Sequence, residues 1–144
     1  MPYHFKLDTL LNLRRNFEEQ ARLKLAGEQR TLDNHLSFLG GLRKERAAMI
    51  DEMEARKKKQ MTGAMYSLYV EGIGTQEWRI QVQNNTVEAQ KQVVAQTREE
   101  LAEAMKQRKM IEKIREKDYL NYQREELRRE QNENDEQAVL RHNR

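Results

Sequence analysis

The sequence lacks the residues that most often interrupt a helix or crosslink a chain. It contains no cysteine, so no disulfide framework and no thiolate chemistry are available to it. Its single proline is Pro2, and proline is the residue that most reliably breaks a helix. From Tyr3 onward, the whole chain is therefore free to be helical.

Aromatic residues are also scarce, at 6%, whereas charged residues reach 35%. This balance disfavours a globular core, and high charge alone would also fit disorder. The abundance of good helix formers and a regular apolar spacing argue against disorder. Two apolar series repeat every seven residues: Leu25, Leu32 and Leu39, and then Ile73, Ile80, Val87, Val94 and Leu101. The sequence predicts an all-α fold, a long antiparallel two-helix coiled-coil hairpin.

The expected organisation is a single coiled-coil rod over residues 1–144, with helix one at about 3–60, a turn at about 61–64 and helix two at about 65–140. Gly63 marks this turn, and Gly72 with Gly74 marks a second candidate turn. Folding back at Gly63 would pair Leu39 with residue 87 and Leu11 with residue 115. Residues 121–144 would then overhang as an unpaired charged helix, which is marginal without a partner.

After Leu101 the apolar residues change phase, to Met105, Ile111 and Ile114. Such a change of phase predicts a stutter in the coiled coil.

Nothing in the sequence predicts catalysis, a metal site or a cofactor. There is no phosphate-binding glycine loop, and His4, His35 and His142 lack metal-ligand spacing. No apolar signal segment or membrane-spanning stretch is present. The net charge of +3 is far below that of a typical nucleic-acid binder. We therefore expect a protein that is not an enzyme and has no nucleic-acid partner.

Three local features suggest contact surfaces, and each has a simpler structural explanation. The basic run from Arg56 to Lys59 can bind an anion or simply end a helix in solvent. Aromatic residues near the expected turn can anchor a partner or close the seam: Tyr66, Tyr69 and Trp78. Tyr119 and Tyr122 lie beyond the expected reach of helix one, which favours a partner surface.

Both ends of the chain resemble the FliJ family of flagellar type III export proteins. The N-terminal match comprises Phe5, Leu7, Leu10, Leu11, Leu13, Arg14, Glu18, Glu19, Ala21, Arg22, Leu25 and Ala26. The C-terminal match comprises residues 111–117 followed by Tyr122, Arg128, Arg129, Glu130, Gln131, Asp135, Glu136 and Ala138. The matches occur in the family's order, and the resemblance covers the whole chain.

The resemblance implies a coiled-coil stalk that binds the ring of the export ATPase FliI and promotes its assembly and activity. It also implies coupling to the membrane export gate protein FlhA, and handling of export chaperones. The implied location is the cytoplasm, peripheral at the cytoplasmic face of the inner membrane. By resemblance, the ATPase-binding residues are Leu7, Leu10, Leu11, Arg14, Lys113, Arg115 and Tyr122.

The gate-binding residues implied by the resemblance are Tyr69, Ile73, Gln76 and Ile80. Gln76 departs from the family pattern, which is smaller or apolar there, and so do Gly72 and Gly74. An alternative is a structural coiled-coil dimer or scaffold rod unrelated to export. A monomeric hairpin would support the stalk, whereas a parallel dimer with matching positions paired would support the scaffold.

Overall fold

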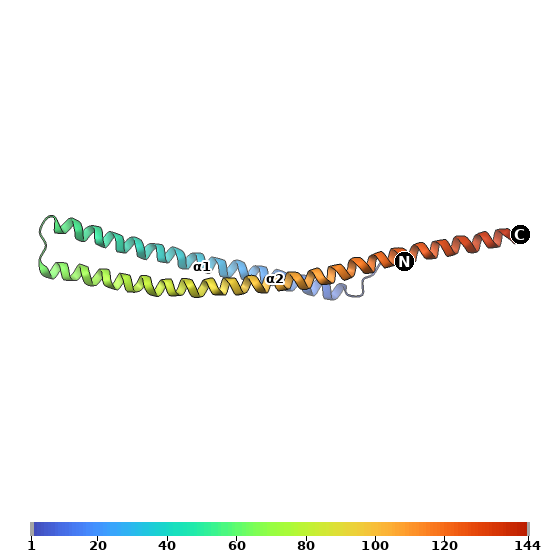
Figure 1. Cartoon of the computed structure of the whole chain (residues 1–144), viewed down its shortest axis with the longest axis horizontal. Helices are drawn as coiled ribbons and strands as arrows, with labels where there is room; N and C mark the ends of the chain where they lie inside the picture. Colours follow the sequence, from blue (N-terminus) through green and yellow to red (C-terminus); the bar gives the residue numbers. More distant parts are fainter. Residues whose placement is uncertain (1, 144) are drawn as a thin grey trace. The chain divides into compact units, whose positions relative to one another are not determined.

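A computed structural model of the chain describes residues 2–143 and consists of two long helices (Figure 1). Helix α1 is Asp8–Lys57 and has 50 residues; helix α2 is Gly63–His142 and has 80 residues. Residues 58–62 connect them, and no strand occurs within residues 2–143. The predicted helical hairpin is confirmed.

The structure divides into two compact units, each containing part of both helices. Unit 1 consists of Met1–Ala21 and Leu101–Arg144, and unit 2 of Arg22–Glu100. Hydrogen bonds between the helices join early residues of α1 to late residues of α2 in both units. The two helices are therefore antiparallel in unit 1 and in unit 2.

Local capping explains where the helices begin. The Met65 N–H donates to the Thr62 hydroxyl oxygen over 3.2 Å, so Thr62 is the N-cap of α2. Helix α1 begins at Asp8, later than the expected Tyr3, with the Asp8 carboxylate in the positive first turn. Gly72 and Gly74 lie inside α2, so the chain does not turn there.

A ladder of glutamine side chains crosses the interface of unit 2. Gln76 Nε2 donates to the Leu42 carbonyl over 3.1 Å, Gln83 to the His35 carbonyl over 3.0 Å and Gln90 to the Glu28 carbonyl over 3.0 Å. The three donors are spaced by seven residues, and so are the three acceptors. We call these three interactions the glutamine ladder.

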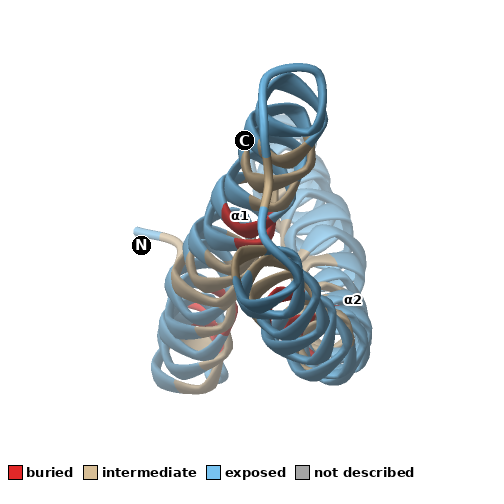
Figure 2. Ribbon diagram, turned by 90° about the vertical axis from the view of Figure 1, so that its left-hand side faces the viewer, coloured by how far each residue is buried: buried red, intermediate tan, exposed pale blue. Residues whose placement is uncertain are grey.

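Apolar residues fill the layers that alternate with the ladder. Leu39, Leu42, Val87 and Val94 are each at most 5% exposed, whereas most of the chain is exposed (Figure 2). Gln76 is only 2% exposed, and its amide also donates to Glu45 Oε2 over 2.8 Å. Burying a polar group is costly unless it is hydrogen-bonded, and the ladder meets this requirement.

The ladder corrects the register expected from the sequence. Because Gln76 lies at the level of Leu42 and Gln83 at that of His35, Leu39 lies at the level of Ile80 rather than residue 87. The expected pairing of Leu39 was displaced by about one heptad. The cause is the position of the connection, which is centred on residue 60 rather than on Gly63. Moving this centre by one residue along the chain changes by two residues which part of α2 lies opposite a given residue of α1.

We predict that Gln76→Ala lowers the free energy of unfolding by about 1–2 kcal/mol. The change removes two hydrogen bonds and leaves a small cavity between the helices. Urea unfolding followed by circular dichroism measures the effect. The control is Gln81→Ala, an exposed glutamine on the same helix, whose effect should stay within about 0.5 kcal/mol. Equal effects for the two variants would contradict the structural role of the ladder.

Candidate functional site

The interface of unit 1 contains a charged cluster in addition to buried apolar residues such as Leu11. Arg108 Nε donates to Glu18 Oε2, Arg108 Nη2 lies 3.3 Å from Glu18 Oε1, and Nη1 lies 2.8 Å from Glu112 Oε2. Arg15 Nη2 approaches the other oxygen of Glu112 at 3.5 Å. The Glu18 side chain is 7% exposed and that of Arg108 20% exposed. Arg108 and Glu18 therefore form a largely buried, bidentate arginine–carboxylate pair.

The pKa of Arg108 is raised above its ordinary value. The hydrogen bond to Glu18 is the main cause, and the nearby charge of Glu112 adds to it, while partial burial acts in the opposite direction. The guanidinium therefore keeps its charge, and the cluster needs both carboxylates to balance it.

This cluster also corrects the expected stutter. Arg108, Arg115 and Tyr122 continue the seven-residue series after Leu101, and all three are half-buried. Of the residues expected in the seam after the change of phase, Met105 and Ile111 are half-buried, whereas Ile114 is 46% exposed. The heptad geometry continues past Leu101, but charged and aromatic side chains now occupy it.

The segment before α1 is held against α2 by aromatic contacts. The Tyr3 ring lies 5.0 Å from the Tyr119 ring, edge to face, and 5.2 Å from the Tyr122 ring. The Tyr3 hydroxyl donates to Asp118 Oδ2 over 2.9 Å. Phe5 next to it is 3% exposed. We call Tyr3, Asp118, Tyr119 and Tyr122 the tyrosine clasp. The two tyrosines that were expected to be free for a partner thus already contact Tyr3.

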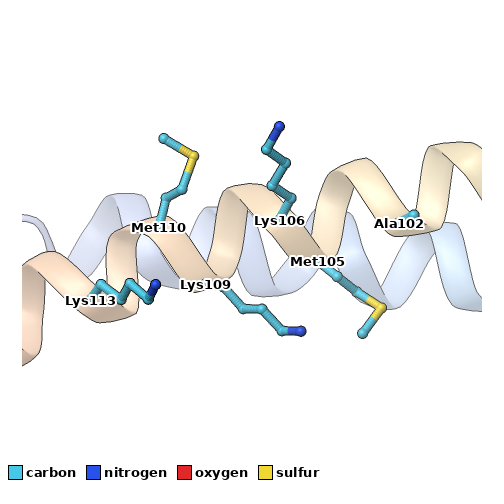
Figure 3. Close-up of a pocket in the computed structure, with 6 residues that line it drawn as sticks. All are labelled: Ala102, Met105, Lys106, Lys109, Met110 and Lys113. Carbon is cyan, nitrogen blue, oxygen red and sulfur yellow. The ribbon is translucent and has the colours of Figure 1, made fainter.

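An outward face of α2 in unit 1 carries lysines and methionines. Side chains spaced three and four residues apart line it: Ala102, Met105, Lys106, Lys109, Met110 and Lys113 (Figure 3). Lys106, Lys109 and Lys113 form no ion pair within residues 2–143, since the nearby Glu112 binds Arg15 and Arg108. Met110 is 50% exposed. We call these six residues the lysine–methionine face.

The end of α2 has no covering helix within unit 1. From residue 123 to residue 143, every residue is exposed except Glu126, which is half-buried. The exposed apolar side chains on this tail include Leu127, Val139 and Leu140. The tail is helical as far as His142.

Comparison with known protein families identifies a family whose model covers nearly the whole chain. The model of the family described as flagellar FliJ protein matches residues 3–144. The chain belongs to the flagellar FliJ protein family. It is therefore a component of flagellar protein export. No curated protein and no solved structure matches the chain.

The ATPase-binding residues implied by the FliJ resemblance all lie in unit 1, at different depths. Leu11 is 1% exposed and Leu10 half-buried, whereas Leu7 is 37% exposed. Arg14 Nε is buried and has no hydrogen-bond partner among the described residues. Lys113 is exposed on the lysine–methionine face, while Arg115 and Tyr122 are half-buried. The structure thus separates surface residues from interface residues in this set.

The gate-binding residues implied by the FliJ resemblance lie in unit 2 and face α1. Gln76 is buried in the ladder, and Tyr69, Ile73 and Ile80 are half-buried. The Tyr69 hydroxyl donates to Glu52 Oε1 over 3.0 Å. Beside them, an outward stripe exposes Leu68, Trp78 and Val82, at 68%, 67% and 44%.

Two further properties bear on function in this FliJ-family chain. No helix in residues 2–143 has a stretch long and apolar enough to cross a membrane. Over the same range, no group of three His, Cys, Asp or Glu side chains is placed to hold a metal ion.

Sequence reasoning did not find the glutamine ladder or the Glu18–Arg108 pair. The spacing of Gln76, Gln83 and Gln90 by seven residues is visible in the sequence. Each of them stands three residues after one of the first three members of the Ile73 series. The ladder can be recognised in the sequence when both interface positions of each heptad are considered, and not only the apolar position.

We expect Glu18→Gln to lower the free energy of unfolding by about 2 kcal/mol, because Arg108 would lose its buried counter-charge. Urea unfolding at neutral pH measures this change. Glu116→Gln alters an exposed glutamate of the same unit and should change the stability by less than about 0.5 kcal/mol. If Glu18→Gln were as mild as the control, the pair would not stabilise unit 1.

The tyrosine clasp predicts a pH dependence. Removal from water, followed by the hydrogen bond to Asp118, raises the pKa of Tyr3 above its ordinary value of 10.0. Both effects favour the protonated phenol, so its contribution to stability is complete below pH 10.0 and is lost as the pH rises from there through the raised pKa. Tyr3→Phe should therefore destabilise the chain at about pH 8, and the difference from the unaltered chain should shrink by about pH 11.

Urea unfolding of both proteins at the two pH values measures this difference. Tyr66→Phe serves as the control, because the Tyr66 hydroxyl has no hydrogen bond within the described residues. A Tyr3→Phe effect that stays constant with pH would show that the hydroxyl does not act through Asp118.

Proposed function

We propose that this FliJ-family chain is the stalk that binds the ring of the flagellar export ATPase FliI, promotes its assembly and activity, and couples it to the export gate protein FlhA. It acts in the cytoplasm and contacts the membrane complex peripherally at the cytoplasmic face of the inner membrane. Export chaperones are further partners. The chain contributes binding surfaces and no catalytic groups.

The observation that carries the proposal is the exposed surface of α2 in unit 1. Three lysines without ion pairs among the described residues lie beside two methionines, followed by a tail that α1 does not cover within the unit. Methionine side chains adapt to the shape of a partner, and unpaired lysines attract a surface rich in carboxylates. We therefore assign the ATPase contact to the lysine–methionine face and the tail, with Leu7 and Lys113 as its exposed members from the family set.

The interface residues of the family set act differently in this proposal. Leu10, Leu11, Arg14, Arg115 and Tyr122 hold the helices of unit 1 together, so they support the ATPase contact by positioning its surface. Leu11 is fully buried, and changing it would impair folding and ATPase binding together.

For the gate contact, we propose the outward stripe of unit 2. Leu68, Trp78 and Val82 are exposed on one side of α2, and aromatic residues frequently anchor interfaces. Tyr69, Ile73, Gln76 and Ile80 lie on the neighbouring side of the same stretch and set the position of this stripe.

The antiparallel pairing weighs against the scaffold alternative. In both units the heptad positions of one chain pair with each other, so they are not free to form a parallel dimer. Nucleic-acid binding through residues 56–59 also lacks support, because Arg56 lies 5.9 Å from the Tyr69 ring centre and Lys57 lies 3.3 Å from Glu54 Oε1.

The triple variant Lys106→Glu, Lys109→Glu and Lys113→Glu should weaken binding to the cognate export ATPase at least tenfold, about 1.4 kcal/mol. It should also abolish stimulation of ATP hydrolysis. Isothermal titration calorimetry and a phosphate-release assay measure the two effects. All three lysines are exposed, so thermal unfolding should change little.

The matched control makes the same charge change elsewhere, at Lys44, Lys58 and Lys59, which are also exposed. Equal losses in both triple variants would show a general charge effect and contradict the assigned face. If the unaltered chain neither binds nor stimulates the ATPase, the proposed function is wrong.

A further inference from the structure

The interface of unit 2 repeats with the same period on both helices, and this repetition permits a second alignment. The ladder donors Gln76, Gln83 and Gln90 are seven residues apart, as are the acceptor carbonyls of residues 42, 35 and 28. A shift of α2 by one heptad along α1 would bring Gln83 to the Leu42 carbonyl and Gln90 to the His35 carbonyl. Every helix carbonyl offers a similar acceptor, so these hydrogen bonds can re-form.

The apolar layers repeat with the same period. In the observed register, the ladder places Leu39 at the level of Ile80 and Leu32 at the level of Val87. After the shift, Leu39 would lie at the level of Val87 and Leu32 at that of Val94. Apolar residues would again meet apolar residues, so the hydrophobic contribution of these layers would be retained.

We propose that unit 2 has a second register, in which α2 is displaced by one heptad, about 10 Å, toward the connection between the helices. The glutamine ladder and the apolar layers can form in both registers, so their contribution to stability is retained in the second. The displacement is a conformational switch built into the helix pair, of the kind in which one packed element moves by whole turns along another.

Gly63 supplies independent support. It is the first residue of α2, its φ is not positive, and a Cβ added there would meet nothing within 4 Å. Nothing in the observed register requires glycine at this first helical position. In the second register the connection would be centred near Gly63, where α1 extends and needs a residue that can take a left-handed conformation to end it.

Specific contacts hold the observed register. Gln90 Nε2 donates to Glu28 Oε2 over 2.6 Å, and Arg46 Nη2 lies 2.9 Å from Glu77 Oε1. Both contacts join α1 to α2, so a one-heptad shift would break them. Further contacts also favour the observed register: Gln76 Nε2 with Glu45 Oε2, Lys24 Nζ with Glu100 Oε2 at 3.0 Å and, in unit 1, Arg108 with Glu18. The exposed ion pairs among them contribute little to stability, so the second register is the less populated one.

Spin labels on the full chain test the proposal, since the absence of native cysteine makes each introduced cysteine unique. The first pair is Asp51→Cys with Glu99→Cys. Its two labels are roughly 45 Å apart in the observed register and roughly 10 Å closer in the second. The second pair is Arg30→Cys with Leu68→Cys, at roughly 30 Å and roughly 10 Å farther. All four positions are exposed in unit 2. The control pair, Leu68→Cys with Glu99→Cys, lies on α2 alone and should keep one distance.

The decisive measurement uses Glu28→Gln with Glu77→Gln, which weakens the Gln90–Glu28 hydrogen bond and removes the Arg46–Glu77 ion pair. Pulsed electron–electron double resonance measures the distances between the labels. It should show a second population, at least threefold larger than in the unaltered chain, in which the labels of the first pair are closer and those of the second pair are farther apart. Glu88→Gln removes an ion pair within α2 and should leave the populations unchanged. Adding Gly63→Ala to the double variant should reduce the second population at least threefold.

A single distance in the double variant would overturn the proposal. An increase in both inter-helix distances would overturn it as well, because the helices would then be separating rather than sliding. A second population that persists unchanged after Gly63→Ala would overturn the role given to Gly63.

A role for this switch in coupling the ATPase to the gate rests on the proposed function, and the same labels separate the two. Addition of the cognate export ATPase should change the ratio of the populations at least threefold. Stimulated hydrolysis with an unchanged ratio would overturn the coupling role and leave the proposed function standing. Absence of binding would overturn the proposed function, while the distances in the isolated chain would still decide whether two registers exist.

Discussion

Two paired helices can bury only one narrow strip of side chains each, and this constraint governs the rest of the structure. Most of the polar groups that fall on the strip are hydrogen-bonded across the interface or, as with Thr97, to their own helix. Unit 2 crosses the interface with neutral amides that bind backbone carbonyls. Unit 1 crosses it with an arginine held by two carboxylates. Stability therefore comes from many modest contacts distributed along the helices.

The sequence predicted the helical hairpin because period and helix propensity are local properties. The missing proline and the series from Ile73 to Leu101 were sufficient for this. The register was not accessible in the same way. Shifting α1 by one heptad leaves apolar residues opposite apolar residues, so the pattern alone cannot select one alignment. The selection depends on the Thr62 cap and on contacts such as that between Arg46 and Glu77, which are visible only in three dimensions.

The candidate site shows the same limit. The resemblance marked residues of both ends without distinguishing those that face solvent from those that face the other helix. Lys113 and Leu11 belong to the same implied set, yet one is exposed and the other is 1% exposed. Arg108 was missed because a charged residue at a seam position interrupts an apolar series, although its partners Glu18 and Glu112 make that position favourable.

The sequence separation of the contacts implies an order of assembly. The hydrogen bond from Gln76 to Leu42 closes 34 residues, those of Gln83 and Gln90 close 48 and 62, and the one from Tyr3 to Asp118 closes 115. Contacts near the connection require the least loop-closure entropy, and each closed contact shortens the loop that remains for the next. Pairing of the helices is thus expected to nucleate beside residues 58–62 and to proceed away from the connection. The tyrosine clasp is then the last contact to form and the first to open.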